Sequence, residues 1–279
     1  RNMDESSDDR STVLLGVGGG MVRDKSGFVA STYMRVMEFG FIPTTLLAQV
    51  DASVGGKNGV NVDGYKNIIG VFNQPRFVIC DPSFLRTLPE REFRAGLAEI
   101  IKAGIIGDPG LFGLFEEHTF EDFRAGGDLL EEIITRAVKV KAGIVQRDEL
   151  EHGERRKLNL GHTFAHAMEK SMPLYSHGEA VAAGIVVVSE AAVKLGKLPE
   201  SDATRIMRVI DKMGLPMKYP ADMRRLLNAV KFDKKRERES INIVFPTTIG
   251  QCEVVLMPIA EIEELFASPL PEDATLFGD

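Results

Sequence analysis

The chain is organised around two stretches, Leu158-Asn159-Leu160-Gly161-His162-Thr163-Phe164-Ala165-His166 and Ser176-His177-Gly178-Glu179-Ala180, which hold three of its five histidines. His162 and His166 are four residues apart, so on a helix they lie on one face, one turn apart. His177 precedes the apolar run from Ala180 to Val188, which predicts a buried helix with that imidazole at its start. Histidines packed in an ordinary core are the alternative, but three of them in two short stretches favour a metal site.

A site with two histidines needs a third ligand and an open position if it is to do chemistry. The best candidate is Glu99, which interrupts a segment with the apolar spacing of a helix, formed by Phe93, Leu97, Ile100, Ile101 and Ile105. A buried carboxylate must be paired or bound to a metal, because a bare buried charge costs several kcal/mol. A salt bridge to Lys102, within one turn of the same helix, is the other reading of this residue.

Length and composition are those of an ordinary globular protein. The 279 residues can form one large or two ordinary domains, and 44% hydrophobic and 27% charged residues argue against disorder. No apolar run is long enough to span a bilayer, the first eleven residues do not resemble a signal peptide, and a net charge of −7 argues against nucleic acid as a partner. Cys80 and Cys252 are far apart and in no CxxC motif, so we expect a reducing cytoplasm.

The first part of the chain predicts an α/β arrangement with a phosphate-binding turn. A short aliphatic run at 11–15 predicts a strand, Gly16-Val17-Gly18-Gly19-Gly20 follows it, and residues 21–34 have helical spacing. In this arrangement, backbone N–H groups at the helix start can bind a pyrophosphate. A plain tight turn is the alternative, because the third glycine of GxGxxG falls on Met21.

Further strands are predicted at 39–42 and 76–80, with a short helix at 46–50 between them. Thr44 and Thr45 follow the first of these strands and place two hydroxyls at its end. The glycines of Gly55-Gly56-Lys57 would allow backbone and ammonium to approach an anion together, and Lys66-Asn67 repeats the pairing of cation and amide. Solvated surface lysines are the alternative.

From Leu88 onward the pattern is mainly helical. Helices are predicted at 111–117, 129–145, 158–169, 180–195 and 201–213, and a late hairpin at 241–245 and 251–256. We therefore place a domain boundary here: an α/β domain over 1–88 and a mainly α-helical domain over 89–279.

Segments over nearly the whole chain resemble the 3-dehydroquinate synthase family, the NAD- and zinc-dependent lyases of the shikimate pathway. Their order and spacing together are specific, although no single segment is. The resemblance rests on Gly18-Gly19-Gly20, Phe28-Val29-Ala30-Ser31-Thr32-Tyr33-Met34-Arg35, Pro43-Thr44-Thr45-Leu46-Leu47-Ala48-Gln49-Val50-Asp51, Gly55-Gly56-Lys57, Gly64-Tyr65-Lys66-Asn67, Leu97-Ala98-Glu99, Asn159-Leu160-Gly161-His162-Thr163 and His177-Gly178-Glu179.

The resemblance implies a fold and a reaction. Residues 1–88 would be the C-terminal part of a Rossmann-like NAD-binding domain, and the family's N-terminal portion, with its first strands and much of its adenosine pocket, is absent from this sequence. A sheet that begins at Val13 would expose a strand edge and an apolar face. The implied reaction converts 3-deoxy-D-arabino-heptulosonate 7-phosphate into 3-dehydroquinate and phosphate, in a homodimer in which Arg35 reaches the neighbouring subunit's pocket.

The resemblance also implies roles for individual residues. Glu99, His162 and His177 would bind zinc, with cobalt as a possible substitute, and His166 would be a neighbouring base or hydrogen-bond donor. The implied NAD contacts are Gly19, Gly20, Asp24, Thr44, Thr45, Asp51, Lys66, Asn67, Phe84 and Thr87. The implied substrate contacts are Arg35, Lys57, Lys102, Lys141, Arg155, Asn159 and one of Lys234 or Lys235.

Arg23 and Lys25 depart from the family pattern and are expected to place two additional positive charges near the pyrophosphate. Three other functions stay open. The first is another sugar-phosphate cyclase, such as a 2-deoxy-scyllo-inosose or valiolone synthase, although Arg155 and the Lys234 region favour a substrate with a carboxylate. The second is the iron-containing or glycerol dehydrogenase group, against which Glu99 and His177-Gly178-Glu179 argue. The third is a non-catalytic binding protein on the same scaffold.

Overall fold

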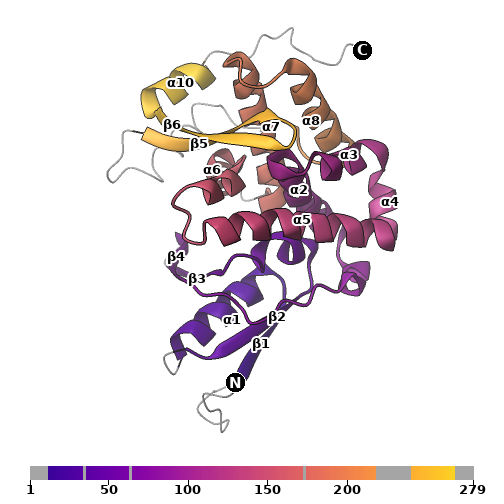
Figure 1. Ribbon diagram of the computed structural model, residues 1–279, viewed down its shortest axis with the longest axis vertical. Coiled ribbons are helices and arrows are strands. Elements are labelled where there is room, and N and C mark those ends of the chain that lie inside the picture. Colours follow the sequence, from indigo (N-terminus) through magenta and orange to yellow (C-terminus); the bar gives the residue numbers. More distant parts are fainter. Residues whose placement is uncertain (1–11, 34–35, 63–64, 172–173, 218–239, 268–279) are drawn as a thin grey trace.

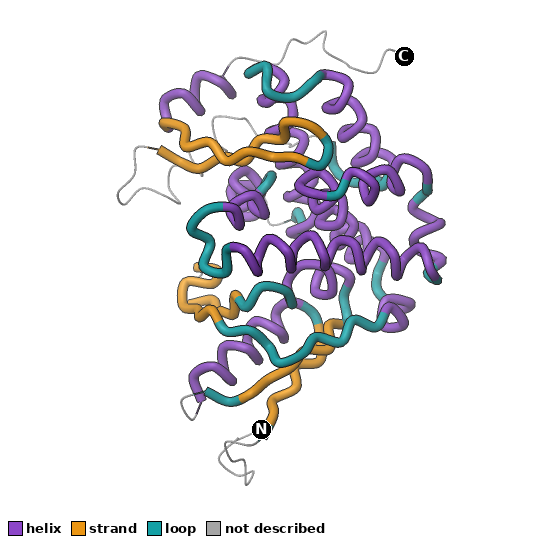
Figure 2. Tube along the Cα trace, in the orientation of Figure 1, coloured by secondary structure: helices purple, strands orange, loops and turns teal. Residues whose placement is uncertain are grey.

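The computed structural model describes residues 12–33, 36–62, 65–171, 174–217 and 240–267. Figure 1 shows a small α/β layer at the N-terminal end and a larger body of helices, which a β-hairpin covers on its far side. Figure 2 shows the same division, with strands at the N-terminal end of the molecule and the later hairpin among the helices of the larger body. An α/β part followed by a mainly helical part agrees with the fold class expected from the sequence.

The α/β layer begins with a parallel β-α-β unit. β1 (Val13–Gly18) pairs in parallel with β2 (Glu38–Pro43), and α1 (Gly20–Thr32) connects them. Phe39 and Phe41 of β2 pack with Ala30 of α1 in a small core of their own. The two predicted strands and the helix between them are confirmed.

One face of β1 is uncovered. Val13, Leu15 and Val17 alternate along the strand and are 44%, 47% and 50% exposed, because alternate side chains of a strand point to the same face. Within the described ranges, β1 pairs with β2 and with no other strand. Within the described residues, the apolar face of β1 is therefore exposed, as expected from the sequence.

The strand predicted at 76–80 is wrong as a regular strand. The segment runs parallel to β2, with the amide of Arg76 donating to the Phe39 carbonyl at 2.8 Å and that of Ile79 to the Phe41 carbonyl at 2.9 Å. Regular pairing is limited to the single bridge between Phe41 and Val78. Pro75 and Pro82 bound the segment, and prolines cannot donate to a ladder.

Three elements join this layer to the helices. Residues 46–52 are helical, and the last five form a π-helix, η3 (Ala48–Ala52). An antiparallel hairpin of β3 (Lys57–Val62) and β4 (Tyr65–Phe72) follows, which the sequence did not predict. The 3-10 helix η4 (Pro82–Thr87) then leads into the helical body.

The helical body contains α2 (Glu90–Gly107), α3 (Pro109–Glu117), α4 (Phe120–Ala125), α5 (Asp128–Arg147), η5 (Glu154–Asn159), α6 (His162–Ser171), α7 (His177–Lys194), α8 (Glu200–Lys212) and α10 (Ile259–Ala267), with the hairpin of β5 (Ser240–Thr248) and β6 (Gln251–Pro258). The predicted helices and hairpin are confirmed, except that the helix predicted at 158–169 starts too early. Residues 154–159 form η5, and Gly161 adopts φ +76°, a conformation that interrupts a helix, so α6 begins at His162.

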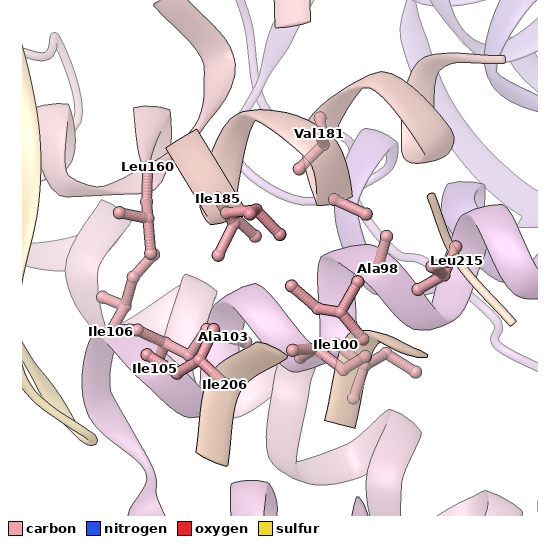
Figure 3. Close-up of a cluster of buried hydrophobic side chains, with 14 of the residues drawn as sticks. Ala98, Ile100, Ala103, Ile105, Ile106, Leu160, Val181, Ile185, Ile206 and Leu215 are labelled. Atoms are coloured by element: carbon pink, nitrogen blue, oxygen red, sulfur yellow. The ribbon is translucent and has the colours of Figure 1, made fainter. Parts of the chain in front are cut away.

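α2 and α7 form the centre of the main core. Every residue of α2 from Ala95 to Ile106 is buried, as is every residue of α7 from Ala180 to Ser189. Figure 3 shows side chains of α2, α7 and α8 in one apolar cluster, among them Ile100, Ile185 and Ile206. Two charged residues of α2, Glu99 and Lys102, are buried beside this core at 3% exposure each. No helix within the described ranges is both long and apolar enough to cross a membrane.

Candidate active site

Glu99 of α2, His162 of α6 and His177 of α7 meet at one place. One ligand-type atom from each lies within 4.8 Å of the others. Oε1 of Glu99 is 3.4 Å from Nε2 of His177 and 3.6 Å from Nε2 of His162. The structure thus brings together the three residues expected to bind a metal.

A close contact between α2 and α7 sets the distance between Glu99 and His177. A Cβ atom on Gly178 would lie 2.5 Å from Cα and 2.6 Å from the carbonyl carbon of Ala95. Only glycine allows the two backbones to approach this closely. Ala95 lies one turn before Glu99, and Gly178 directly follows His177, so the contact lies next to both ligands.

A second glycine contact sets the position of His162. A Cβ atom on Gly184 of α7 would lie 3.0 Å from the carbonyl carbon of Gly161, and one on Gly161 would lie 2.9 Å from the side chain and backbone of Ile185. Gly161 directly precedes His162. The start of α6 is therefore held against the middle of α7.

The start of α7 is fixed by polar contacts that the sequence analysis missed. Ser176 and Glu179 form a capping box, in which each side chain bonds to the other residue's backbone amide. Arg91 of α2 binds both carboxylate oxygens of Glu179, at 2.8 and 2.6 Å. The Ser-x-x-Glu spacing of residues 176–179 is a known signal for such a box and could have predicted it.

The three residues fit a tetrahedral metal ion. With bonds of about 2.0–2.1 Å to nitrogen and oxygen, neighbouring ligand atoms of such a site are about 3.3 Å apart, close to the observed 3.4 and 3.6 Å. Both carboxylate oxygens of Glu99 are buried, and neither accepts a well-aligned hydrogen bond from the protein. Two imidazoles and one carboxylate form the donor set of catalytic zinc sites with an open fourth position.

A chain of buried charges extends from Glu99. Nζ of Lys102 contacts Oε2 of Glu99 and lies 3.9 Å from Oδ1 of Asp51 on η3, and Nζ of Lys141 on α5 lies 2.6 Å from the same Asp51 oxygen. Glu99 thus pairs with Lys102 and also faces the two histidines. The chain brings Asp51, Lys102 and Lys141 beside the candidate metal site.

The surroundings favour the charged forms of Glu99, Asp51 and Lys102 but disfavour that of Lys141. Burial raises the pKa of Glu99, but the charge of Lys102 and the contacts with the histidines outweigh it and hold that pKa well below its usual range. Burial likewise raises the pKa of Asp51, and Lys141 outweighs it and lowers that pKa. Burial lowers the pKa of Lys102, but Glu99 and Asp51 raise it above its usual value. For Lys141, burial prevails over Asp51 and its pKa is lowered.

The histidines differ in their protonation. Burial and the charge of Lys102 lower the pKa of His162 to about 3, so its imidazole is neutral, as a metal ligand must be. Burial also lowers the pKa of His177, but Glu169 and Glu99 outweigh it and raise that pKa to about 10 without a metal. The exposed ring of His166 lies 5.6 Å from that of His162 and is not part of the three-residue group.

Lys57 and Asn159, two expected substrate contacts, meet at one carboxylate. Nζ of Lys57 contacts Oε2 of Glu151, and Nδ2 of Asn159 donates to Oε1 of Glu151 at 2.7 Å. Glu151 adopts φ +62°, which is uncommon for a residue with a side chain. Glu151 thus links β3 and η5, a role that was not predicted from the sequence.

Arg155, another expected substrate contact, is buried at 2% exposure. Its guanidinium donates to the carbonyls of Gly55, at 2.7 Å, and Glu149. A Cβ atom on Gly55 would lie 2.6 Å from that guanidinium, and one on Gly56 would lie 2.8 Å from Gln74. The two glycines before Lys57 therefore make room for the side chains of Arg155 and Gln74.

The expected cofactor contacts gather where β1 and β2 end. The amide of Thr44 donates to the Gly18 carbonyl at 3.1 Å, and a Cβ atom on Gly19 would lie 3.2 Å from the Thr45 side chain. α1 begins at Gly20 with no side-chain cap and no acidic residue in its first turn. Its N-terminus is therefore suited to an anion.

Gln49 connects this turn to the other expected cofactor residues. It is fully buried, and its Nε2 donates to the carbonyls of Pro43, at 3.2 Å, and Asp81, at 2.9 Å. η4 is thereby held beside η3, and it carries the exposed Phe84 and Thr87. Gln49 was missed as a residue that positions this part of the site.

The expectation that Arg23 adds a positive charge at the pyrophosphate is wrong. Its guanidinium is buried, lies 2.7 Å from Asp24, and donates to the carbonyl of Lys57 and, at 3.3 Å, to Asn58. Arg23 thus faces β3, where Lys57 and Asn58 accept its hydrogen bonds, and Asp24 balances its buried charge. Asp24, an expected NAD contact, is paired with Arg23, whereas Lys25 is exposed.

Five expected contacts cannot be placed. Arg35, Lys234 and Lys235 lie outside the described residues, as do the side chains of Lys66 and Asn67 on β4.

Two family models match the chain over residues 1–236. The 3-dehydroquinate synthase N-terminal model matches residues 1–95, and the 3-dehydroquinate synthase C-terminal model matches residues 96–236. The 3-dehydroquinate synthase of Prochlorococcus marinus (strain MIT 9313) is 46% identical over 255 residues, which is 90% of this chain and 68% of that protein. The 3-dehydroquinate synthase of Synechococcus sp. (strain CC9605) is 46% identical over 253 residues, with 88% and 68% covered.

Solved structures of two cyclases are similar. ValA, the 2-epi-5-epi-valiolone synthase from Streptomyces hygroscopicus subsp. jinggangensis 5008 with NAD+ and Zn2+ bound, has a TM-score of 0.86 and 31% identity, covering 95% of this chain and 75% of that one. A 2-deoxy-scyllo-inosose synthase complexed with carbaglucose-6-phosphate, NAD+ and Co2+ has a TM-score of 0.80 and 25% identity, with 94% and 75% covered. A probable glycerol dehydrogenase from Sinorhizobium meliloti 1021, at 15% identity, 91% and 75% coverage and a TM-score of 0.61, shares the fold alone.

Proposed function

This chain belongs to the 3-dehydroquinate synthase family. We therefore propose that it converts 3-deoxy-D-arabino-heptulosonate 7-phosphate into 3-dehydroquinate and phosphate in the shikimate pathway. It is an NAD- and zinc-dependent carbon-oxygen lyase. The observation that carries the proposal is the group of Glu99, His162 and His177 beside the buried charges of Lys102, Asp51 and Lys141.

Glu99, His162 and His177 would hold the zinc ion, with cobalt as a possible replacement. A bound zinc ion lowers the pKa of hydroxyls at its open position, which favours their oxidation. Lys102 contacts the Glu99 oxygen that faces away from the histidines and so keeps the ligand set anionic and in place. The Gly178 and Gly184 contacts hold the three helices at the required distance.

The glycine turn and the N-terminus of α1 would bind the pyrophosphate of NAD through Gly19 and Gly20, with Thr44 and Thr45 beside them. Bound there, NAD would supply a hydride acceptor for the substrate and, once reduced, a hydride donor. Asp51 lies on η3, three residues beyond Ala48, whose amide donates to the Thr45 hydroxyl at 3.2 Å. Asp51 would therefore connect the cofactor residues to the metal site. Asp24, Lys66, Asn67, Phe84 and Thr87 complete the proposed NAD contacts.

Lysine, arginine and asparagine side chains would bind the anionic substrate. Lys102 and Lys141 lie beside the metal site, and Lys57 and Asn159 share Glu151. A substrate with a carboxylate and a phosphate would compete with Glu151 for the Lys57 ammonium and the Asn159 amide, because both of these donors bond better to an anionic ligand than to solvent. Arg35 and one of Lys234 or Lys235 complete the proposed set, and Arg155 would join it by exchanging its bonds to the Gly55 and Glu149 carbonyls for bonds to the substrate. His166 would move or donate a proton next to His162.

Sequence identity favours this function over the other cyclases, since the chain is 46% identical to 3-dehydroquinate synthases and 31% and 25% identical to the two solved cyclases. The test measures phosphate release and product identity with NAD, zinc and 3-deoxy-D-arabino-heptulosonate 7-phosphate. The same assay with a sugar phosphate that lacks the carboxylate is the control. Formation of 3-dehydroquinate from the first substrate supports the proposal, and turnover of the control alone would refute it.

We also propose that the protein is cytoplasmic and forms a homodimer. Cys80 and Cys252 are both free thiols, which supports the cytoplasm as a compartment that keeps thiols reduced. We propose a homodimer on the family resemblance, and light scattering of the purified protein tests it: a monomer at micromolar concentration would refute the dimer.

A further inference from the structure

Glu169, which has no role in the function proposed above, faces the ring nitrogen of His177 that points away from the candidate metal site. Its Oε1 lies 3.3 Å from Nδ1 of His177, while Nε2 of the same ring lies 3.4 Å from Oε1 of Glu99. The imidazole is therefore held between two carboxylates, one on each nitrogen. The Glu169 side chain is 10% exposed, so the contact is largely shielded from water.

The second histidine has a similar arrangement with a different acceptor. Nδ1 of His162 lies 3.1 Å from the carbonyl oxygen of Leu160, and its Nε2 faces Glu99 at 3.6 Å. In both rings, Nδ1 meets an acceptor and Nε2 faces the candidate metal site. Such an acceptor fixes the tautomer with hydrogen on Nδ1 and leaves the Nε2 lone pair free for a metal.

We infer that Glu169 is a positioning residue for the metal ligand His177: it accepts the Nδ1 hydrogen and fixes the ring with Nε2 towards the metal. α6 then carries the ligand His162 and the carboxylate that orients the other ligand. The two residues are seven apart, so they lie on one face of the helix. This inference rests on the proposed function, because it requires Glu99, His162 and His177 to bind a metal.

The test is zinc affinity, measured by competition with a chromophoric chelator on the full chain, for Glu169→Ala and Glu169→Gln. The cobalt-loaded proteins supply a second readout, since the visible absorption of cobalt depends on ligand geometry. Glu190→Ala and Glu190→Gln are matched controls, because Glu190 is a half-buried carboxylate more than three turns further along α7.

We expect Glu169→Ala to weaken zinc binding by about 10- to 100-fold and to change the cobalt spectrum. Glu169→Gln keeps an acceptor oxygen at the same place and should recover most of the affinity, whereas a merely structural role predicts no such recovery. Both Glu190 variants should match the unchanged protein. Equal zinc affinity and an unchanged cobalt spectrum in Glu169→Ala would overturn this inference alone. If the unchanged protein bound no metal, the proposed function and this inference would both fall.

Discussion

Replacing Gly178 with alanine tests whether the contact between α2 and α7 sets the metal geometry. The added Cβ would lie 2.5 Å from Cα of Ala95, whereas ordinary van der Waals contact begins at 3.4 Å. The carbonyl oxygen of Ala95 would lie closer still, so the two helices must separate by at least about 0.9 Å at this point. Both colliding groups are backbone or directly attached to it, so no flexible side chain can absorb the change.

The separation acts directly on the ligands. If it lies along the line between Nε2 of His177 and Oε1 of Glu99, their distance grows from 3.4 Å to at least about 4.3 Å, well beyond the roughly 3.3 Å of a tetrahedral site. If the helices move back so that the ligands can bind the metal together, the added Cβ is overpacked again, which costs about 1–3 kcal/mol. Metal affinity should fall by about 5- to 150-fold, at 1.4 kcal/mol for each factor of ten.

Zinc affinity by chelator competition and thermal unfolding of the metal-free protein separate the two effects. The metal-free variant can relax by separating the two helices, so its stability should fall by less than that of the metal-bound form. Gly113→Ala on α3 is the matched control, because a Cβ there meets nothing within 4 Å and alanine stabilises a helix by up to about 1 kcal/mol relative to glycine. Unchanged zinc affinity in Gly178→Ala would refute the reasoning.

Three further perturbations have defined outcomes. Backbone hydrogen bonds, of which that from Arg155 has the largest effect, lower the pKa of Asp148 to about 2. The stabilisation that ionised Asp148 contributes is therefore complete above about pH 4 and is lost as the pH falls towards 2. In chemical denaturation, Asp148→Asn should be less stable than the unchanged protein at pH 7 and equally stable near pH 2. Lys141→Ala should lower the free energy of unfolding by about 3 kcal/mol, because Asp51 loses its ion-pair partner. Lys139→Ala, at an exposed site on the same helix, should leave the free energy of unfolding unchanged. Equal losses of stability in the two variants would contradict the pairing of Lys141 with Asp51. Chelating zinc present at 100 times its Kd should remove about 2.7 kcal/mol and lower Tm by about 5–10 °C, and a Tm insensitive to chelator would contradict a native metal site.

Each candidate metal residue carries a local signal in the sequence, although the resemblance to the family, and not the spacing, left His166 out of the set. His162 and His166 have helical spacing, and His177 begins a helix whose apolar run is buried as predicted. Glu99 is an acid inside an apolar helix, so its burial required a partner, and the structure provides both the lysine and the histidines. Which of those partners it would meet depends on helix packing, which local spacing does not determine.

Contacts made by tertiary packing could not be predicted. Arg23 and Arg155 appear in the sequence as charges available to an anion, yet both guanidinium groups are buried and bound to backbone carbonyls. The close approaches at Gly178 and Gly184 involve residues 83 and 23 positions away, respectively. Such contacts depend on how the helices cross, and a glycine in a helix has several other possible roles.

Glu169 and the β3–β4 hairpin show two different reasons for a miss. Glu169 lies seven residues after His162, a spacing that places it on the histidine face, so the sequence contained a signal that was not used. The hairpin joins strands of mixed polar and glycine residues, without the regular alternation that predicts a strand.

The zinc content of the purified protein and of its Glu99→Gln variant tests the proposed metal site most directly. Glu92→Gln, at an exposed position of the same helix, is the control, and circular dichroism checks that the helices remain. We predict about one zinc ion per chain in the unchanged protein and in the control, and close to none in Glu99→Gln, because the open site needs its three protein ligands. Equal zinc content in all three proteins would contradict the assignment of Glu99, His162 and His177 as the metal site.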